Sequence, residues 1–173
     1  MPSHTISVVV ENEFGVLARV AGLFSGRGYN IESLTVNEDP IDPTVSRIVL
    51  VTSGDEQVLE QINKQLNKLV SVIKIIDFKD VETVDRELVM VRVAVDDRTR
   101  SEFDSIVSAF RGRVVDIGPR STTVELTGDS EKVKGFINLL RPLGIKEIVR
   151  SGKVAIARSV QLNGGRRSKE ISQ

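Results

Sequence analysis

The chain begins with two hydrophobic periods in succession. Apolar residues stand at every second position in Ile6–Val10, as they do in a strand with one buried face. In Val16–Phe24 they recur at spacings of three and four, which predicts a helix with one apolar stripe. Gly26 and Gly28 mark the end of that helix, because glycine most easily adopts the left-handed backbone of a helix terminus.

The next elements complete an order of strand, helix, strand, strand, helix, strand. Residues 30–38 (NIESLTVNE) and 46–53 (SRIVLVTS) read as strands, and the two prolines in 39–43 predict a loop between them. A second helical stripe covers residues 58–69, and a last strand covers residues 72–76. This order is that of the split βαβ, or ferredoxin-like, arrangement.

The same order recurs in the second half of the chain. The predicted elements there are the strands 88–95, 113–117, 122–127, 145–149 and 153–157 and the helices 103–110 and 133–140. We therefore predict an α+β protein with two tandem ferredoxin-like βαββαβ domains, at residues 4–78 and 88–160. The charged stretch 79–87 (KDVETVDRE) is the predicted linker, and the polar tail 161–173 is predicted to be disordered.

A four-stranded sheet with helices on one face leaves its other face open. In the first domain Val9, Val36, Val49 and Val51 are available for that face. A domain of about 80 residues is also small enough to be marginally stable alone. These two features predict a homodimer in which a second sheet or chain covers the open face.

The composition excludes several classes of function. The 24 Lys and Arg balance the 24 Asp and Glu, so charge-driven binding to nucleic acid or to an anionic membrane is not expected. The absence of cysteine excludes disulfides and thiol chemistry, and the single histidine, His4, argues against a His-based triad or metal site. No apolar run reaches the roughly 18 residues that span a bilayer, and the N-terminus has no signal-peptide pattern. We expect a soluble, cytoplasmic protein with no catalytic residues and no metal ligands.

The stretch ENEFGVLAR, between the first strand and the first helix, carries the most informative chemistry. Gly15 lets the backbone come close to a ligand, and the first N–H groups of the following helix have no partner within the helix. Such a helix start suits a carboxylate or phosphate, and Asn12 can both donate and accept hydrogen bonds. Together these groups match the two charged ends of an amino acid. The alternative is structural only: Asn12 or Glu13 caps the helix, and Gly15 makes the turn.

A phosphate-handling enzyme is the rival interpretation. Acylphosphatases share this fold and hold phosphate in a glycine-containing loop with a following arginine and a supporting asparagine. Gly15, Arg19 and Asn30 imitate that set loosely. Glu11 and Glu13 flank the loop, however, and like charges there repel a dianion.

Longer stretches resemble a known family. Residues 5–19 (TISVVVENEFGVLAR) look like the start of an ACT domain. Residues 27–36 (RGYNIESLTV) closely resemble the small, regulatory subunit of acetolactate synthase, also called acetohydroxyacid synthase. Further similar stretches lie within 46–47, 54–70, 86–88, 110–112, 115–117, 125–128 and 150–152. The resemblance spans roughly Thr5–Arg158 and implies that the N-terminal domain is an ACT domain.

The resemblance implies a noncatalytic partner of an enzyme. In that family the large catalytic subunit holds thiamine diphosphate, magnesium and FAD, and it condenses pyruvate with pyruvate or 2-oxobutyrate in branched-chain amino-acid synthesis. The small subunit raises this activity and confers feedback inhibition, usually by valine. For the present chain the family implies a homodimer, a large subunit as partner and no cofactor of its own. A stand-alone amino-acid-sensing ACT module for another enzyme is the alternative.

The resemblance also implies an effector site between the ACT domains of two chains. Asn12, Gly15 and neighbouring main chain come from one chain, and Asn30 with Ile31 comes from the other. Phe14 stands where relatives vary, which leaves the effector open among valine, leucine and isoleucine. The expected effector-binding residues are Asn12, Glu13, Phe14, Gly15, Val16, Leu17, Asn30 and Ile31.

Overall fold

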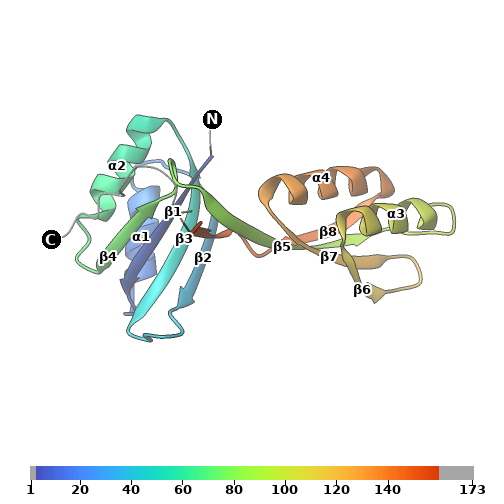
Figure 1. Ribbon diagram of the computed structural model, residues 1–173, viewed down its shortest axis with the longest axis horizontal. Helices are drawn as coiled ribbons and strands as arrows, with labels where there is room; N and C mark the ends of the chain where they lie inside the picture. The colour runs from blue at the N-terminus through green and yellow to red at the C-terminus, as the bar shows by residue number, and fades with distance from the viewer. Residues whose placement is uncertain (1–2, 160–173) are drawn as a thin grey trace.

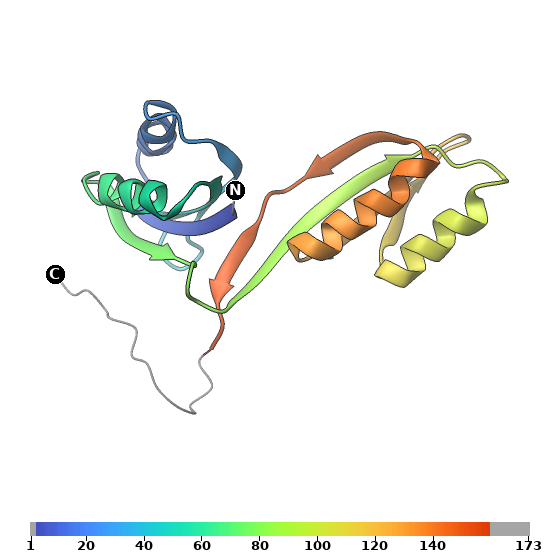
Figure 2. The ribbon, with the colours of Figure 1, turned by 90° about the horizontal axis from the view of Figure 1, so that it is seen from above.

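A computed structural model describes residues 3–159 and shows two lobes side by side (Figure 1). We call residues 3–78 the N-terminal domain and residues 83–158 the C-terminal domain. One long strand leads from the first domain into the second, and a later strand returns beside it (Figure 2). The tail 161–173, predicted to be disordered, lies outside the described residues.

The N-terminal domain has the predicted element order. Its elements are β1 (Ser3–Glu11), α1 (Val16–Ser25), β2 (Ile31–Glu38), β3 (Val45–Ser53), α2 (Glu56–Leu66) and β4 (Val72–Asp77). The strands lie in the order β2-β3-β1-β4, and each neighbouring pair is antiparallel. The ferredoxin-like prediction is therefore confirmed, with β2 at one edge of the sheet.

The periodic apolar residues of the sequence form the core of this domain. Every second residue of Ile6–Val10 is buried against the helices, where it meets Phe24 of α1 and Ile62 of α2. The start of α2 is fixed by Asp55, whose carboxylate accepts a hydrogen bond from the Val58 N–H at 2.9 Å. The local signals of strand, helix and cap thus agree with the packed structure.

The C-terminal domain repeats the architecture with its own core. Its elements are β5 (Thr83–Val93), α3 (Arg100–Phe110), β6 (Arg113–Ile117), β7 (Thr122–Gly128), α4 (Ser130–Leu140), the 3₁₀ turn η1 (Arg141–Leu143), β8 (Ile145–Arg150) and β9 (Val154–Ala157). The strand order is β6-β7-β5-β8, with β9 paired to β5. Val91, Phe103 and Phe136 are fully buried in this second core, which shares no residue with the first.

The stretch 79–87 differs from the predicted linker in its second part. From Thr83 onward the chain already belongs to β5, and this first part of the strand pairs with β9. The charged residues that suggested a linker are paired instead: Asp85 lies 3.1 Å from the Nζ of Lys153. Because these residues lack the apolar alternation of a half-buried strand, the sequence pattern did not reveal the strand.

The open face of the N-terminal sheet is covered in part by the chain itself. Val49 and Val51 lie on this face and are only 4% and 6% exposed. Gly152 of the C-terminal domain lies against Ser33, the neighbour of Val51 on the same face. Val36 points to the helix side instead, because it is in register with the core residues of β3. Part of this face is therefore covered without a second chain, and the homodimer stays a prediction.

Candidate functional site

The loop between β1 and α1 places the first group of expected effector residues, 12–17, at one end of the N-terminal sheet. Gly15 directly precedes α1 with φ 79°, in the left-handed region that favours glycine. No side chain within residues 3–159 caps this helix. Of the structural alternative, the cap by Asn12 or Glu13 is therefore not formed, whereas Gly15 makes the turn as expected.

Asn12 is held by the loop between β2 and β3. Its backbone N–H donates to the Thr44 carbonyl oxygen at 2.7 Å. Its side-chain Nδ2 donates to the Pro43 carbonyl oxygen at 3.0 Å and to Oε2 of Glu38 at 3.1 Å. Both amide protons are thereby used, and no described residue donates to Oδ1. Asn12 thus presents an acceptor oxygen, beside the Glu38 carboxylate, to a positively charged group.

The start of α1 presents hydrogen-bond donors in the same loop. The N–H groups of Leu17 and Ala18 have no acceptor among residues 3–159, whereas the Arg19 N–H bonds to the Gly15 carbonyl oxygen at 2.9 Å. Free N–H groups and the helix dipole favour an anion at this position. The loop therefore offers acceptors for an ammonium group and donors for a carboxylate.

The side chains of the loop differ in their availability to a ligand. Glu13 and Phe14 are exposed, and Leu17 is 42% exposed. Val16 is 3% exposed and packs in the core. Of the two apolar residues expected to touch a ligand at the start of α1, Leu17 is accessible and Val16 is not.

Asn30 and Ile31 lie at the opposite end of the sheet. β1 and β2 both run antiparallel to β3, so they point in the same direction, and both Ile31 and His4 are in register with Thr52. The stretch of β1 from His4 to Glu11 is about 23 Å long at the usual rise of a strand. A single chain does not bring the two groups of expected effector residues together.

The Asn30 side chain is free although its backbone is fixed. The buried Thr52 donates its Oγ1–H to the Asn30 carbonyl oxygen at 2.7 Å, which fixes the backbone before β2. Asn30 is exposed, and its amide makes no hydrogen bond with the described residues. The amide is therefore available to a ligand or to a second chain.

Arg19 and Asn30 do not converge on Gly15 as the phosphate-handling interpretation requires. Arg19 is used within the loop: Nη1 donates to Ser71 Oγ at 3.1 Å, and Nη2 donates to the Phe14 carbonyl oxygen at 3.4 Å. Asn30 stands at the other end of the sheet. The acylphosphatase arrangement is not formed.

The loop between β2 and β3 supports the site through its own hydrogen bonds. The Asp39 carboxylate accepts from the N–H groups of Ile41 at 2.9 Å and Asp42 at 3.2 Å, which lowers the pKa of Asp39 below its usual 3.8. Asp42 in turn accepts from the N–H and the hydroxyl of Thr44 at 3.0 and 2.6 Å. The Thr44 carbonyl oxygen accepts from the backbone N–H of Asn12, so these contacts hold the backbone of the β1–α1 loop at Asn12.

Sequence reasoning missed three residues that hold the β1–α1 loop in place. Glu38 and Pro43 bind Asn12, and Ser71 binds Arg19. They stand 26, 31 and 52 positions from their partners, so no local spacing points to them. The predicted loop at 39–43 was the one available signal, since it leads into β3, whose first residue pairs with the last residue of β1.

Within residues 3–159, no group of three or more His, Cys, Asp or Glu side chains is placed to hold a metal ion. None of the helices in this part of the chain is long and apolar enough to cross a membrane.

Two family profiles match the chain. The AHAS small subunit-like ACT domain matches residues 6–74, and the profile of the small subunit of acetolactate synthase matches residues 86–159. Together they cover both domains. The family resemblance inferred from the sequence is therefore confirmed.

Relatives and a solved structure agree with the profiles. The probable acetolactate synthase small subunit of Methanothermobacter thermautotrophicus is 52% identical over 157 residues, 90% of this chain and 93% of the relative. The acetolactate synthase small subunit of Mycobacterium leprae is 46% identical over 158 residues, 91% of this chain and 93% of the relative. The crystal structure of the small subunit from Thermotoga maritima superposes with a TM-score of 0.82 at 38% identity, covering 93% of this chain and 100% of that chain. The chain thus belongs to the acetolactate synthase small-subunit family, with an ACT domain followed by the family's C-terminal domain.

Proposed function

We propose that this chain is a regulatory subunit that raises the activity of the catalytic subunit of acetolactate synthase and makes it sensitive to feedback inhibition by valine. The chain performs no catalysis of its own. Thiamine diphosphate, magnesium and FAD belong to the large catalytic subunit. Family membership and the hydrogen-bonding groups of the β1–α1 loop support this proposal.

The observation that carries the effector site is the separation of its two halves within one chain. β2 is an edge strand, and no described strand pairs with its outer edge (Figure 1). A second copy related by a two-fold axis can pair its β2 antiparallel with this one, since such an interface is self-complementary. That pairing brings Asn30 and Ile31 of the second copy opposite Glu38. Because Asn12 binds Glu38, the two halves then meet at one site.

The chemistry of the assembled site fits a branched-chain amino acid. The carboxylate lies at the N–H groups of Leu17 and Ala18, and the ammonium group lies at Asn12 Oδ1 beside Glu38. Leu17 and the second copy's Ile31 supply an apolar wall for the side chain. Valine satisfies these three requirements without leaving a polar group unpaired.

Effector binding must favour one state of the enzyme to inhibit it. A ligand shifts an equilibrium only by its difference in affinity for the two states. Coupling energies of this kind are typically about 1–3 kcal/mol. We expect valine to shift the large subunit toward its less active state by an amount in this range.

The test combines binding with activity. Calorimetric titration of the purified chain with valine, leucine and isoleucine reports which of them binds. Assays of the large subunit alone, with the chain, and with chain and amino acid report activation and inhibition. We expect activation by the chain and inhibition by the amino acid that binds. Absence of activation refutes the regulatory role, whereas activation without binding or inhibition refutes only the effector site.

A further inference from the structure

The contact between the two domains is concentrated in the turn between β8 and β9. Across residues 3–159, the hydrogen bonds that join the N-terminal and C-terminal domains all involve the backbone of Lys153. Its N–H donates to Ser33 Oγ at 3.1 Å, and its carbonyl oxygen accepts from Thr35 Oγ1 at 3.4 Å. No ion pair of this part of the chain joins the domains. We call residues 150–153 the interdomain turn.

Glycine allows the interdomain turn to lie directly on β2. Gly152 has φ +84°, a conformation that L side chains rarely adopt. A Cβ atom there lies 2.7 Å from Ser33 Oγ and 2.9 Å from Thr35 Cγ2. Both distances are shorter than van der Waals contact, so a Cβ at this position requires either the turn or the Ser33 and Thr35 side chains to shift.

The other side of the interdomain turn is fixed to the C-terminal domain. Arg150 donates from Nε and Nη2 to the two carboxylate oxygens of Glu87 at 2.8 and 2.6 Å, and Glu87 is only 5% exposed. The Ser151 N–H donates to the Leu88 carbonyl oxygen at 2.9 Å. Glu87 and Leu88 belong to β5, a central strand of this domain. The turn therefore moves together with the C-terminal domain.

On the N-terminal side, the contact lies close to the expected effector residues. Ser33 follows Ile31 by two positions on β2, and the register between β2 and β3 shifts between these two residues. Such irregularities are sites where a strand bends and re-aims its side chains. A change at Ile31 is thus next to the residue that holds the interdomain turn.

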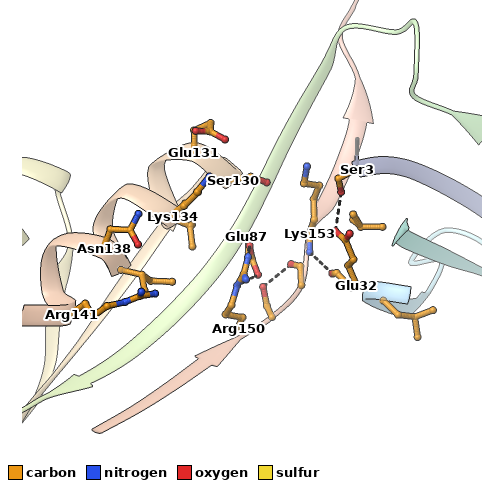
Figure 3. A pocket seen from close by; sticks show the side chains of 17 residues that line it. Ser3, Glu32, Glu87, Ser130, Glu131, Lys134, Asn138, Arg141, Arg150 and Lys153 are labelled. Carbon is orange, nitrogen blue, oxygen red and sulfur yellow. Dashed lines mark hydrogen bonds and ion pairs between the residues drawn. The ribbon is translucent and has the colours of Figure 1, made fainter. Parts of the chain in front are cut away.

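A cleft lies between the two domains beside the interdomain turn. It has a volume of about 810 Å³ and lies between β2 and α4 (Figure 3). Glu32 faces the cleft from the N-terminal domain, and Lys134 of α4 and Arg141 of η1 face it from the C-terminal domain, with no ion pair across it among residues 3–159. The interdomain turn is therefore the point at which a shift of β2 reaches the C-terminal domain.

We propose that the contact of Gly152 and Lys153 with Ser33 and Thr35 transmits effector binding from β2 to the C-terminal domain. This inference rests on the proposed function. An effector at Asn30 and Ile31 changes the end of β2, and the contact converts that change into a different placement of the C-terminal domain. The contact lies outside the ligand site. Its loss should therefore leave effector binding in place and weaken the inhibition that binding causes.

The test uses Gly152→Ala in the full chain, reconstituted with the large subunit. Gly144→Ala is the matched control, because Gly144 also has a positive φ (+91°) but meets only Ala94 of its own domain. Calorimetry with valine, leucine and isoleucine measures binding, and the assay measures activation and inhibition. We expect Gly152→Ala to bind the effector with an affinity within about threefold of wild type and to activate the large subunit. Inhibition of the large subunit by the effector should weaken at least tenfold. The Gly144→Ala control should keep wild-type inhibition.

A milder variant and a second measurement keep the test interpretable if Gly152→Ala misfolds. Thr35→Val removes only the hydroxyl that donates to Lys153. Hydrogen exchange of the Lys153 amide, measured with and without effector, should change in the wild type and not in Gly152→Ala. Wild-type inhibition in both Gly152→Ala and Thr35→Val, or loss of binding together with inhibition, overturns the coupling role. A wild-type chain that activates the large subunit but binds none of the three amino acids refutes the proposed effector site, and a chain that does not activate refutes the proposed regulatory role.

Discussion

Asn12 Nδ2 lies 3.1 Å from Oε2 of Glu38, which joins the β1–α1 loop to the last residue of β2. The same nitrogen donates to the Pro43 carbonyl oxygen at 3.0 Å, so the orientation of the amide is fixed. The amide oxygen is then left to accept from a ligand. One side chain therefore both closes the loop and supplies a binding group.

Asn12→Ala should weaken valine binding by about tenfold or more, since a lost hydrogen bond to a charged group costs about 1.5–3 kcal/mol. Activation of the large subunit should persist, because the substitution leaves the core intact. Calorimetric titration and the inhibition assay measure the two effects. Asn138→Ala is the control, because Asn138 is exposed and makes no hydrogen bond with the described residues. Unchanged valine sensitivity in Asn12→Ala removes Asn12 from the site.

Asn12→Ala and Asn30→Ala should each weaken binding of the effector, and mixing the two variants should restore part of that binding. In an Asn12→Ala/Asn30→Ala heterodimer, one site keeps both asparagines and the other loses both. Random exchange gives about half heterodimers, so about a quarter of the wild-type sites return. Calorimetry after refolding the variants together counts these sites, and each variant alone is the control. No recovery in a confirmed heterodimer means that the site is not shared between chains.

Arg150→Ala should destabilise the C-terminal domain by about 2 kcal/mol, because it leaves the buried Glu87 carboxylate without its bidentate partner. The value is below that of a fully buried pair, since the Arg150 side chain is 53% exposed. Arg92→Ala breaks the exposed pair with Glu147 and should cost less than about 1 kcal/mol. Urea unfolding measures the free energy of unfolding of both variants. Equal losses of this free energy contradict the role assigned to the burial of Glu87.

Acid should remove a contribution of Asp96 to stability. Its carboxylate accepts from the N–H of Thr99 at 2.9 Å and from the N–H of Arg98 at 3.0 Å, and these bonds, Thr99 foremost, lower its pKa below 3.8. A carboxyl with a lowered pKa stabilises the fold above its unfolded pKa, and the effect is lost as pH falls through the folded pKa. Urea unfolding at about pH 6 and pH 3 should therefore show a smaller acid loss in Asp96→Asn than in wild type. Asp104→Asn on the exposed side of α3 is the control, and an unchanged loss in Asp96→Asn contradicts the assignment.

Much of the architecture follows from local patterns. The alternation in Ile6–Val10 and the helical stripe in Val16–Phe24 predicted β1 and α1, because periodicity reports which face of an element is buried. Asp55 and Asp129 cap α2 and α4, and each accepts a hydrogen bond from the N–H three residues later, a relationship that is local in the sequence. The start of β5 at Thr83 was missed, because its stability comes from pairing with β9 instead of from an apolar face.

The sequence by itself determined the order of the elements, the chemistry of the β1–α1 loop and the family, because each depends on neighbouring residues or on long matching stretches. The tertiary structure alone decided that Asn12 meets Glu38, that Asn30 stands at the far end of the sheet and that Gly152 lies on Ser33. These relationships depend on strand register and on the packing of one domain against the other. Such contacts join residues far apart in the chain, and no local period encodes them.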